Sequence, residues 1–219
     1  MKTRLISHTI PASLEAGETI EELIAYCARV SNPKNQKNHY SDEKLITYLI
    51  RNKHWSPLEM ASVCVEVETT RDIARQMLRH RFSFQEFSQR YADVRQLADN
   101  PFVLREARMQ DHSNRQSSIE TDDEALMDQW EELQIDIAQR TTDAYEWAIG
   151  AGIAKEQARC VLPEGMTTSR LYMNGNIRQW LHYLALRTEA GTQKEHREVA
   201  MACANVIEPV FPIKKYLNF

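Results

Sequence analysis

The chain has 219 residues, a net charge of −4 and 42% hydrophobic residues, values typical of a soluble globular protein. The acidic balance argues against a protein that coats nucleic acid, because such affinity depends on neutralising many phosphates. The first residues lack the apolar segment of a signal peptide, and no stretch is long enough to span a membrane. We therefore expect a cytoplasmic protein without a membrane partner, folded as one domain over residues 1–219.

Cysteine and glycine spacing excludes several kinds of site. The four cysteines form no Cys-x-x-Cys pair, so we expect neither a metal site nor a disulfide framework. The six glycines form neither Gly-x-Gly-x-x-Gly nor a phosphate-binding P-loop. If a nucleotide binds this protein, its phosphates must be met by arginines and helix N-termini instead.

The first third of the chain contains one clear strand signal and several helix signals. Weak alternation over 1–9 allows a strand, and residues 61–68 alternate valine or alanine with polar residues or cysteine, as a half-buried strand does. Capping patterns predict helices from Thr19 to about residue 30 and from Ser41 to about residue 52. Ser56 with Pro57 and Glu59 predicts a further helix start.

An arginine-rich segment follows the strand. The predicted helix from about residue 70 to 79 places Arg71, Arg75 and Arg79 at four-residue spacing on one side. Residues 79–91 then read RHRFSFQEFSQRY, with polar residues at a period of two that favours an extended chain. A solvated surface is the simple alternative. Because no carboxylates match these guanidinium groups in the pattern, we interpret the segment as an anion site for a planar, phosphate-bearing ligand.

The second half is predicted to be mostly helical. Residues 109–124 are polar and predict a surface loop, and the capping pattern at Thr121 opens a long helix that could also serve a subunit contact. Its apolar stripe comprises Leu126, Trp130, Leu133, Ile137, Ala144 and Ala148. Shorter helices are expected over 155–161, over 177–188 after an Asn176 cap, and over 193–210 after a capping box from Thr192 to Glu195. The fold class is α+β, helix-rich with a central, mostly antiparallel sheet.

Several motifs together resemble the flavin-dependent thymidylate synthases over most of the chain. The signature is Arg79-His80-Arg81 followed by Glu86, Ser88, Arg90 and Tyr91, with one residue fewer between Arg81 and Ser88 than the family usually has. Further matches occur in the family's order: Ala28-Arg29-Val30-Ser31, His54-x-Ser56-Pro57-x-Glu59, Gln76, Ala158-Arg159-x-Val161-Leu162-Pro163, Asn176-x-Arg178, Leu186-Arg187 and Gln193-x-Glu195.

The resemblance implies an activity and a set of site residues. The reaction is reductive methylation of dUMP to dTMP, with 5,10-methylenetetrahydrofolate as carbon donor and NADPH as reductant of bound FAD. The implied FAD contacts are Ser56, Arg79, His80, Arg81, Glu86, Asn176, Arg178 and His182. The implied dUMP contacts are Gln76, Met77, Leu78, Arg79, Glu86, Phe87, Ser88, Gln89, Arg90, Arg159 and Arg187. The family forms homotetramers with active sites shared between subunits.

Arg187 is our choice for the catalytic residue among these. A fixed guanidinium stabilises negative charge that develops on the uracil ring, although it cannot act as a base at neutral pH. The hydroxyl of Ser88 would be a weak nucleophile without a positioned base, so we assign Ser88 to ligand binding.

Two other functions fit part of the run at 79–91. A single-strand nucleic-acid-binding protein could stack bases on Phe82, Phe84 and Tyr91, but the acidic balance of the chain counts against it. A phosphohistidine enzyme would carry Arg-His-Gly, and here Arg81 follows His80.

Overall fold

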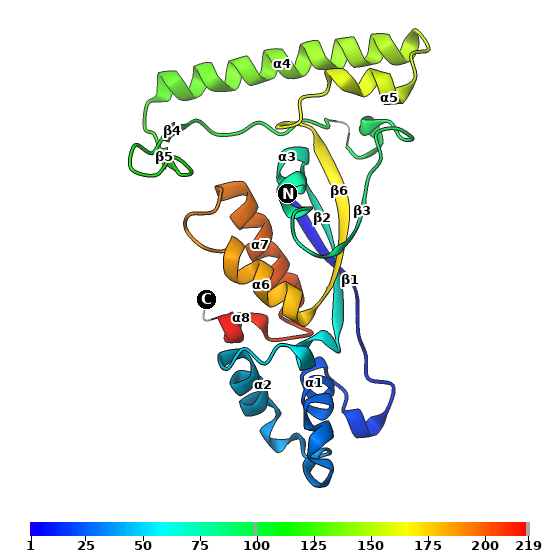
Figure 1. Ribbon diagram of the computed structural model, residues 1–219. Coiled ribbons are helices and arrows are strands. Elements are labelled where there is room, and N and C mark those ends of the chain that lie inside the picture. The colour runs from blue at the N-terminus through cyan, green and yellow to red at the C-terminus, as the bar shows by residue number, and fades with distance from the viewer. Residues whose placement is uncertain (99, 218–219) are drawn as a thin grey trace.

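The computed structural model describes residues 1–98 and 100–217. Figure 1 shows an elongated molecule with a sheet and the C-terminal helices in the middle, two N-terminal helices at one end, and a long helix lying across the other end. The chain therefore combines many helices with an antiparallel sheet, as the sequence predicts. Short 3-10 helices span Leu14–Ala16, Arg29–Ser31, Pro33–Asn35, His39–Ser41, Ser56–Glu59, Val94–Gln96 and Arg159–Val161.

The central sheet has four strands in the order β1-β2-β6-β3, and all neighbours are antiparallel. The strands are β1 (Lys2–His8), β2 (Ser62–Thr70), β6 (Thr168–Asn176) and β3 (Ser83–Glu86). Strand β6 lies between β2 and β3, and nothing in the sequence analysis predicted it. Its alternating burial resembles that of a half-buried strand, but glycine and asparagine at its end weaken the sequence signal.

One face of the sheet forms the core. Val63, Val65 and Val67 of β2 are fully buried against α6 (Ile177–Arg187) and α7 (Lys194–Ile207). The short helix α8 (Ile213–Leu217) follows α7. Figure 1 shows these helices together on one side of the sheet. Because a strand side chain points to alternate faces, the other face of β2 carries its glutamates and cysteine.

The N-terminal end consists of α1 (Ile20–Ala28) and α2 (Asp42–Arg51). Thr19 and Glu22 form the predicted capping box of α1. Ser41 precedes α2 as predicted, but its side chain does not cap that helix. Its Oγ instead accepts a hydrogen bond from Arg29, whose guanidinium forms a buried ion pair with Asp42.

A helical segment starts at Ser56 as predicted, but it is short and lacks the predicted serine cap. The segment Ser56–Glu59 is a single 3-10 turn in which the serine side chain makes no capping hydrogen bond. Glu59 forms an ion pair with Arg178 of α6, so its carboxylate is directed away from the turn. A long-range ion pair therefore replaces the local capping box.

The arrangement of Arg71, Arg75 and Arg79 also differs from the prediction that they lie on one side of a single helix. Helix α3 (Arg71–Met77) ends before Arg79, so the three arginines do not share one helix. Arg71 pairs with Glu86 at 3.3 Å, and Arg75 pairs with Glu164. The sequence reasoning missed these partners because both carboxylates come from segments that only the tertiary fold brings to α3.

The far end is built on α4 (Glu124–Gly150), which Asp123 caps instead of the predicted Thr121. The predicted loop before it contains a small hairpin of β4 (Arg108–Gln110) and β5 (Ser118–Glu120), and α5 (Lys155–Ala158) follows α4. No helix in the described parts of the chain is both long and apolar enough to cross a lipid bilayer.

The apolar stripe predicted on α4 is only partly covered. Ala148 is buried, but Trp130, Leu133 and Ile137 remain 42%, 51% and 45% exposed. The side chains of α4 that are buried include Gln134, whose amide hydrogen-bonds the backbone of Arg105. Figure 1 shows that the small hairpin, an extended segment and α5 lie next to α4, whereas the C-terminal helices are farther away.

Candidate active site

The Arg-His-Arg triplet forms a compact turn, so the prediction of an extended chain holds only for Ser83–Glu86. The amide of His80 donates to the carbonyl of Met77 at 2.9 Å, and that of Phe82 donates to the carbonyl of His80 at 3.0 Å. These bonds continue the end of α3 into a tight turn before β3 begins. The turn leaves the side chains of Arg79 and Arg81 exposed.

Close packing against β6 and α6 holds this turn in place. A Cβ atom on Gly175 would overlap the ring of Phe82, so only glycine permits this approach. The side-chain amide of Gln179 donates to the carbonyl of Arg81. Gln179 also completes a capping box with Asn176, the predicted cap of α6.

His80 and Arg187 meet within one chain. The Nε of Arg187 donates to Nε2 of His80 at 2.9 Å, which requires a neutral ring with its proton on Nδ1. Burial, and then the charge of Arg187, lower the pKa of His80 from 6.5 to about 4. The contact therefore persists at neutral pH and fixes both side chains.

Gln76 lies beside this pair at the end of α3. Its Oε1 is 3.2 Å from Nδ1 of His196, and its Nε2 donates to Oε1 of Gln193 at 2.7 Å. Tyr183 connects His196 with His80. Its hydroxyl is 3.2 Å from Nε2 of His196, and its ring meets the His80 ring edge-on at a centroid distance of 4.9 Å. The sequence analysis did not single out His196 or Tyr183, and only the Gln193-x-Glu195 motif pointed to this region.

A second group lies at the start of α6. Arg178 is paired with Glu59, and His182 packs edge-on against Trp55 at 4.5 Å. Burial and then the charge of Arg178 lower the pKa of His182. Ser56 belongs to the turn that carries Trp55 and Glu59. A groove bordered by Glu59, Ser62, Arg81, Phe82, Ser83, Asn174, Gly175, Asn176 and Gln179 adjoins this group.

A third group forms where residues 88–90 meet α5. Arg90 contacts the carboxylate of Glu156 at 3.3 Å, and the Nε of Arg159 donates to the backbone carbonyl of Glu156 at 3.3 Å. Gln89 is only 4% exposed, and its Nε2 has no hydrogen-bond partner in the structure. Ser88 accepts backbone hydrogen bonds from the turn that follows it. The fold thus gathers residues 88–90 and Arg159, which lie far apart in the sequence.

The remaining predicted residues have partners of their own. Glu86 accepts from the hydroxyl of Ser169 at 2.7 Å in addition to its pair with Arg71. Phe87 packs against a small apolar cluster under α4. Met77 is fully buried, so only its backbone could reach a ligand, whereas Leu78 is 39% exposed.

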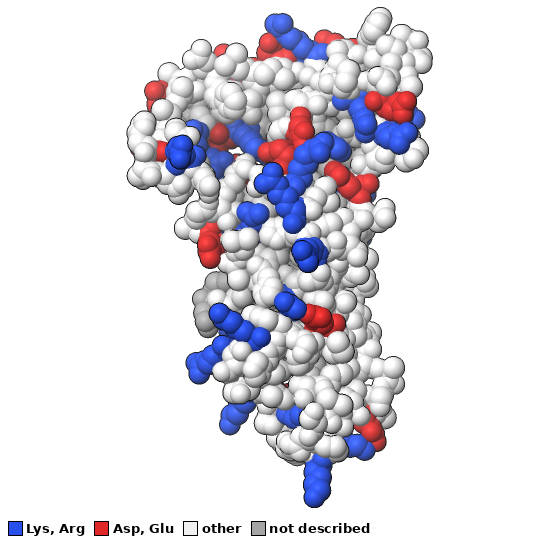
Figure 2. All heavy atoms as spheres, in the orientation of Figure 1, with Lys and Arg blue, Asp and Glu red and all other residues white. Residues whose placement is uncertain are grey.

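The charges around these groups are mixed. Figure 2 shows basic and acidic side chains interspersed on the face seen in Figure 1. Among residues 1–98 and 100–217, neither Arg79 nor Arg81 takes part in an ion pair, and no cluster of His, Cys, Asp and Glu could hold a metal ion. Among the described residues, the side-chain amide of Gln179 links the turn at 79–81 to the start of α6, and no ion pair joins one of the three groups to another.

Comparisons with known proteins agree on one family. Residues 4–213 match the family described as thymidylate synthase complementing protein. The chain is 47% identical to a probable flavin-dependent thymidylate synthase of Paramecium bursaria Chlorella virus 1, with all of both chains covered. It is 44% identical to the flavin-dependent thymidylate synthase of Synechocystis, covering 97% of this chain and 96% of the relative.

A solved structure shares the fold as well. The crystal structure of the UMP/dUMP methylase PolB from Streptomyces cacaoi, bound with 5-Br dUMP, matches with a TM-score of 0.78 and 28% identity. The match covers 99% of this chain and 93% of that one. Sequence and fold agree over nearly the whole length, and the chain therefore belongs to the family of flavin-dependent thymidylate synthases.

Proposed function

We propose that the protein converts dUMP to dTMP by reductive methylation, with 5,10-methylenetetrahydrofolate as carbon donor and NADPH as reductant of bound FAD. Membership of the family supports the reaction. The observation that carries the proposal is the third group: Arg90 and Arg159 both contact Glu156, and the buried Nε2 of Gln89, the residue before Arg90, has no hydrogen-bond partner among the described residues. A buried donor without a partner is costly, so a ligand acceptor is its natural complement.

The turn at residues 79–81 fits the diphosphate of FAD. Arg79 and Arg81 are exposed cations, and the positive end of the α6 dipole lies nearby, since Gln179 bonds the carbonyl of Arg81. The residues proposed to hold FAD are Ser56, Arg79, His80, Arg81, Glu86, Asn176, Arg178 and His182. Bound FAD would supply the hydride, while these side chains bind and orient it.

The nucleotide would be held by the cluster of Gln76, His80 and Arg187 and by the third group. Ser88, Gln89, Arg90 and Arg159 are proposed to bind the phosphate and ribose, and Gln76, Leu78, Arg79, Glu86, Phe87 and the Met77 backbone complete the set. Arg187 is proposed as the catalytic residue, because its guanidinium is fixed by His80 and can stabilise negative charge that develops on the uracil ring.

The assembly proposed is a homotetramer of single-domain chains with active sites shared between subunits. Two observations support it. The predicted site residues form three separate groups within one chain, and α4 exposes Trp130, Leu133 and Ile137. Exposed apolar side chains gathered on one helix are typical of a protein interface.

A reconstitution assay tests the function. Purified protein should bind FAD and oxidise NADPH with formation of dTMP only when FAD, dUMP and methylenetetrahydrofolate are all present. A protein that holds FAD but yields no dTMP would contradict the proposal. Strong, salt-dependent affinity for single-stranded oligonucleotides would instead favour the nucleic-acid alternative, which the relatives do not support.

A further inference from the structure

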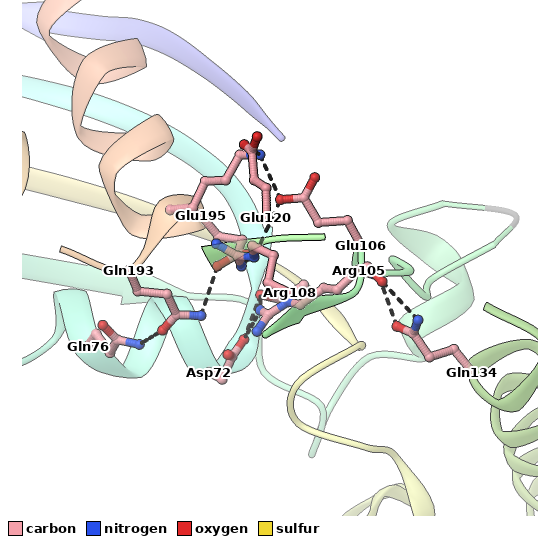
Figure 3. A network of polar contacts seen from close by, with 11 residues as sticks. Asp72, Gln76, Arg105, Glu106, Arg108, Glu120, Gln134, Gln193 and Glu195 are labelled. Carbon is pink, nitrogen blue, oxygen red and sulfur yellow. Dashed lines mark hydrogen bonds and ion pairs between the residues drawn. The ribbon is translucent and has the colours of Figure 1, made fainter. Parts of the chain in front are cut away.

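A chain of hydrogen bonds runs from Gln76 to a carboxylate at the start of α7. Gln76 Nε2 donates to Gln193 Oε1 at 2.7 Å, and Gln193 Nε2 donates to Glu195 Oε2 at 2.9 Å. Figure 3 shows these side chains in line, with Arg108 from β4 paired to Glu195. On its other side, Gln76 Oε1 meets Nδ1 of His196.

The carboxylate sets the direction of every bond in this chain. An ionised carboxylate only accepts hydrogen bonds, and the carboxylate of Glu195 is paired with the guanidinium of Arg108. Gln193 must therefore direct its NH2 group toward Glu195 and its carbonyl toward Gln76. Gln76 must in turn direct its NH2 group toward Gln193 and its carbonyl toward His196.

The same logic extends to the histidine and the tyrosine. Because the Gln76 carbonyl is an acceptor, Nδ1 of His196 must carry a proton. His196 is fully buried, and burial, followed by the charge of Arg187, lowers its pKa from 6.5 to about 3, so the ring is neutral. Its Nε2 is then an acceptor for the hydroxyl of Tyr183 at 3.2 Å.

We propose that His196 and Glu195 are positioning residues, which fix the amide of Gln76 in one orientation and so set the donor and acceptor that it presents to the substrate nucleotide. The inference rests on the proposed function in assigning Gln76 to the dUMP site. Without both ends of the chain, the amide could rotate by half a turn, because its oxygen and nitrogen have almost the same shape. A rotated amide would exchange the positions of the donor and the acceptor that face the nucleotide.

Two substitutions of His196 separate this role from simple packing. Asparagine places its amide at the position of Nδ1 and can keep the donor toward Gln76. Glutamine reaches the position of Nε2 and can keep the acceptor for Tyr183, but it removes the donor toward Gln76. Both variants lose the buried ring, so unfolding temperatures show how much of any effect is structural.

The measurement is the Kd for dUMP of the FAD-loaded protein, by calorimetry. We expect His196→Gln to weaken dUMP binding about tenfold, and His196→Asn to stay within about threefold of the wild type. Tyr183→Phe is the control: it removes the bond to Nε2, keeps both His196 and Gln193 in contact with the Gln76 amide, and should change the Kd less than about twofold. Equal losses in His196→Gln and His196→Asn at equal unfolding temperatures would overturn the inference.

A second readout does not depend on dUMP. Nitrogen-15 NMR of the histidine rings should show His196 as the neutral tautomer protonated at Nδ1, and a proton on Nε2 would overturn the inference. If the FAD-loaded wild type bound no dUMP, the proposed function would fail, and the tautomer would still decide whether the chain orients Gln76. Glu195→Gln removes the carboxylate anchor, so we expect its His196 tautomer signals to broaden or shift.

Discussion

Arg187 donates from Nε to Nε2 of His80 over 2.9 Å, joining the last residue of α6 to the turn that follows α3. The bond uses Nε, whereas the other two guanidinium nitrogens, Nη1 and Nη2, are at the end of the side chain. Both terminal nitrogens therefore remain available for a planar ligand. Because His80 is neutral here, it orients the guanidinium without neutralising its charge.

Replacement of Arg187 by lysine tests this arrangement. An ammonium group cannot reproduce the planar fork, so we expect Arg187→Lys to lower turnover at least about a hundredfold while FAD stays bound. NADPH oxidation coupled to dTMP formation gives the turnover, and the flavin absorbance per protein gives the FAD content. Loss of FAD from this variant would place Arg187 in the flavin site instead.

The low pKa of His80 predicts a loss of stability in mild acid. The unfolded ring takes up a proton near pH 6.5 and the folded ring only near pH 4, so between these values the unfolded state binds more protons. Stability should therefore fall as pH falls from 6.5 toward 4, by up to about 1 kcal/mol per pH unit. Below pH 4 this contribution falls no further.

His80→Gln is the matched variant, because its amide oxygen can accept from Arg187 but does not titrate. Urea unfolding at pH 7 and pH 5 should show a smaller loss for this variant than for the wild type. Equal losses in the two proteins would contradict the assignment of the low pKa to His80, since His196 contributes equally to both.

The sequence predicted what depends on local pattern. The alternation over 61–68 found β2, and the caps at Thr19 and Asn176 found the starts of α1 and α6. The partners of Arg71 and Arg75 could not be predicted in this way, because Glu86 and Glu164 reach them only through the sheet.

For the candidate site, too, the sequence identified individual residues but not the contacts between them. Family motifs named Arg187 and His80, but helix geometry alone could not show that they meet, since the turn after α3 carries His80 back toward α6. His196 and Tyr183 have no motif that marks them, and their role depends on a bond network that crosses three helices.

The exposed arginines of the triplet should govern FAD affinity. Arg81 has no ion pair among the described residues, so its charge is free for a phosphate. We expect Arg81→Ala to raise the Kd for FAD at least about tenfold and to reduce its dependence on salt. Arg51→Ala, an exposed arginine at the end of α2, serves as control and should leave the FAD titration unchanged.

The exposed side of α4 should be required for assembly. Ile137 is 45% exposed, and a charge there would be buried without a partner in a subunit contact. We expect Ile137→Glu to shift the protein from the proposed tetramer to smaller species in light scattering, with loss of flavin. Glu131→Gln on the same helix should remain tetrameric; a tetrameric Ile137→Glu protein would show that this part of α4 lies outside the interface.

Replacement of Gln89 by methionine should have opposite effects on the stability of the ligand-free protein and on its affinity for dUMP. The buried Nε2 of Gln89 has no hydrogen-bond partner within residues 1–98 and 100–217, so methionine, which is similar in shape, removes an unsatisfied donor. We expect Gln89→Met to stabilise the ligand-free protein by about 1 kcal/mol and to weaken dUMP binding at least about tenfold. Thermal unfolding without nucleotide and dUMP titration of the FAD-loaded protein measure the two effects. A variant that is less stable and binds dUMP normally would show that Nε2 serves the fold, whereas opposite changes would connect its missing partner to the nucleotide.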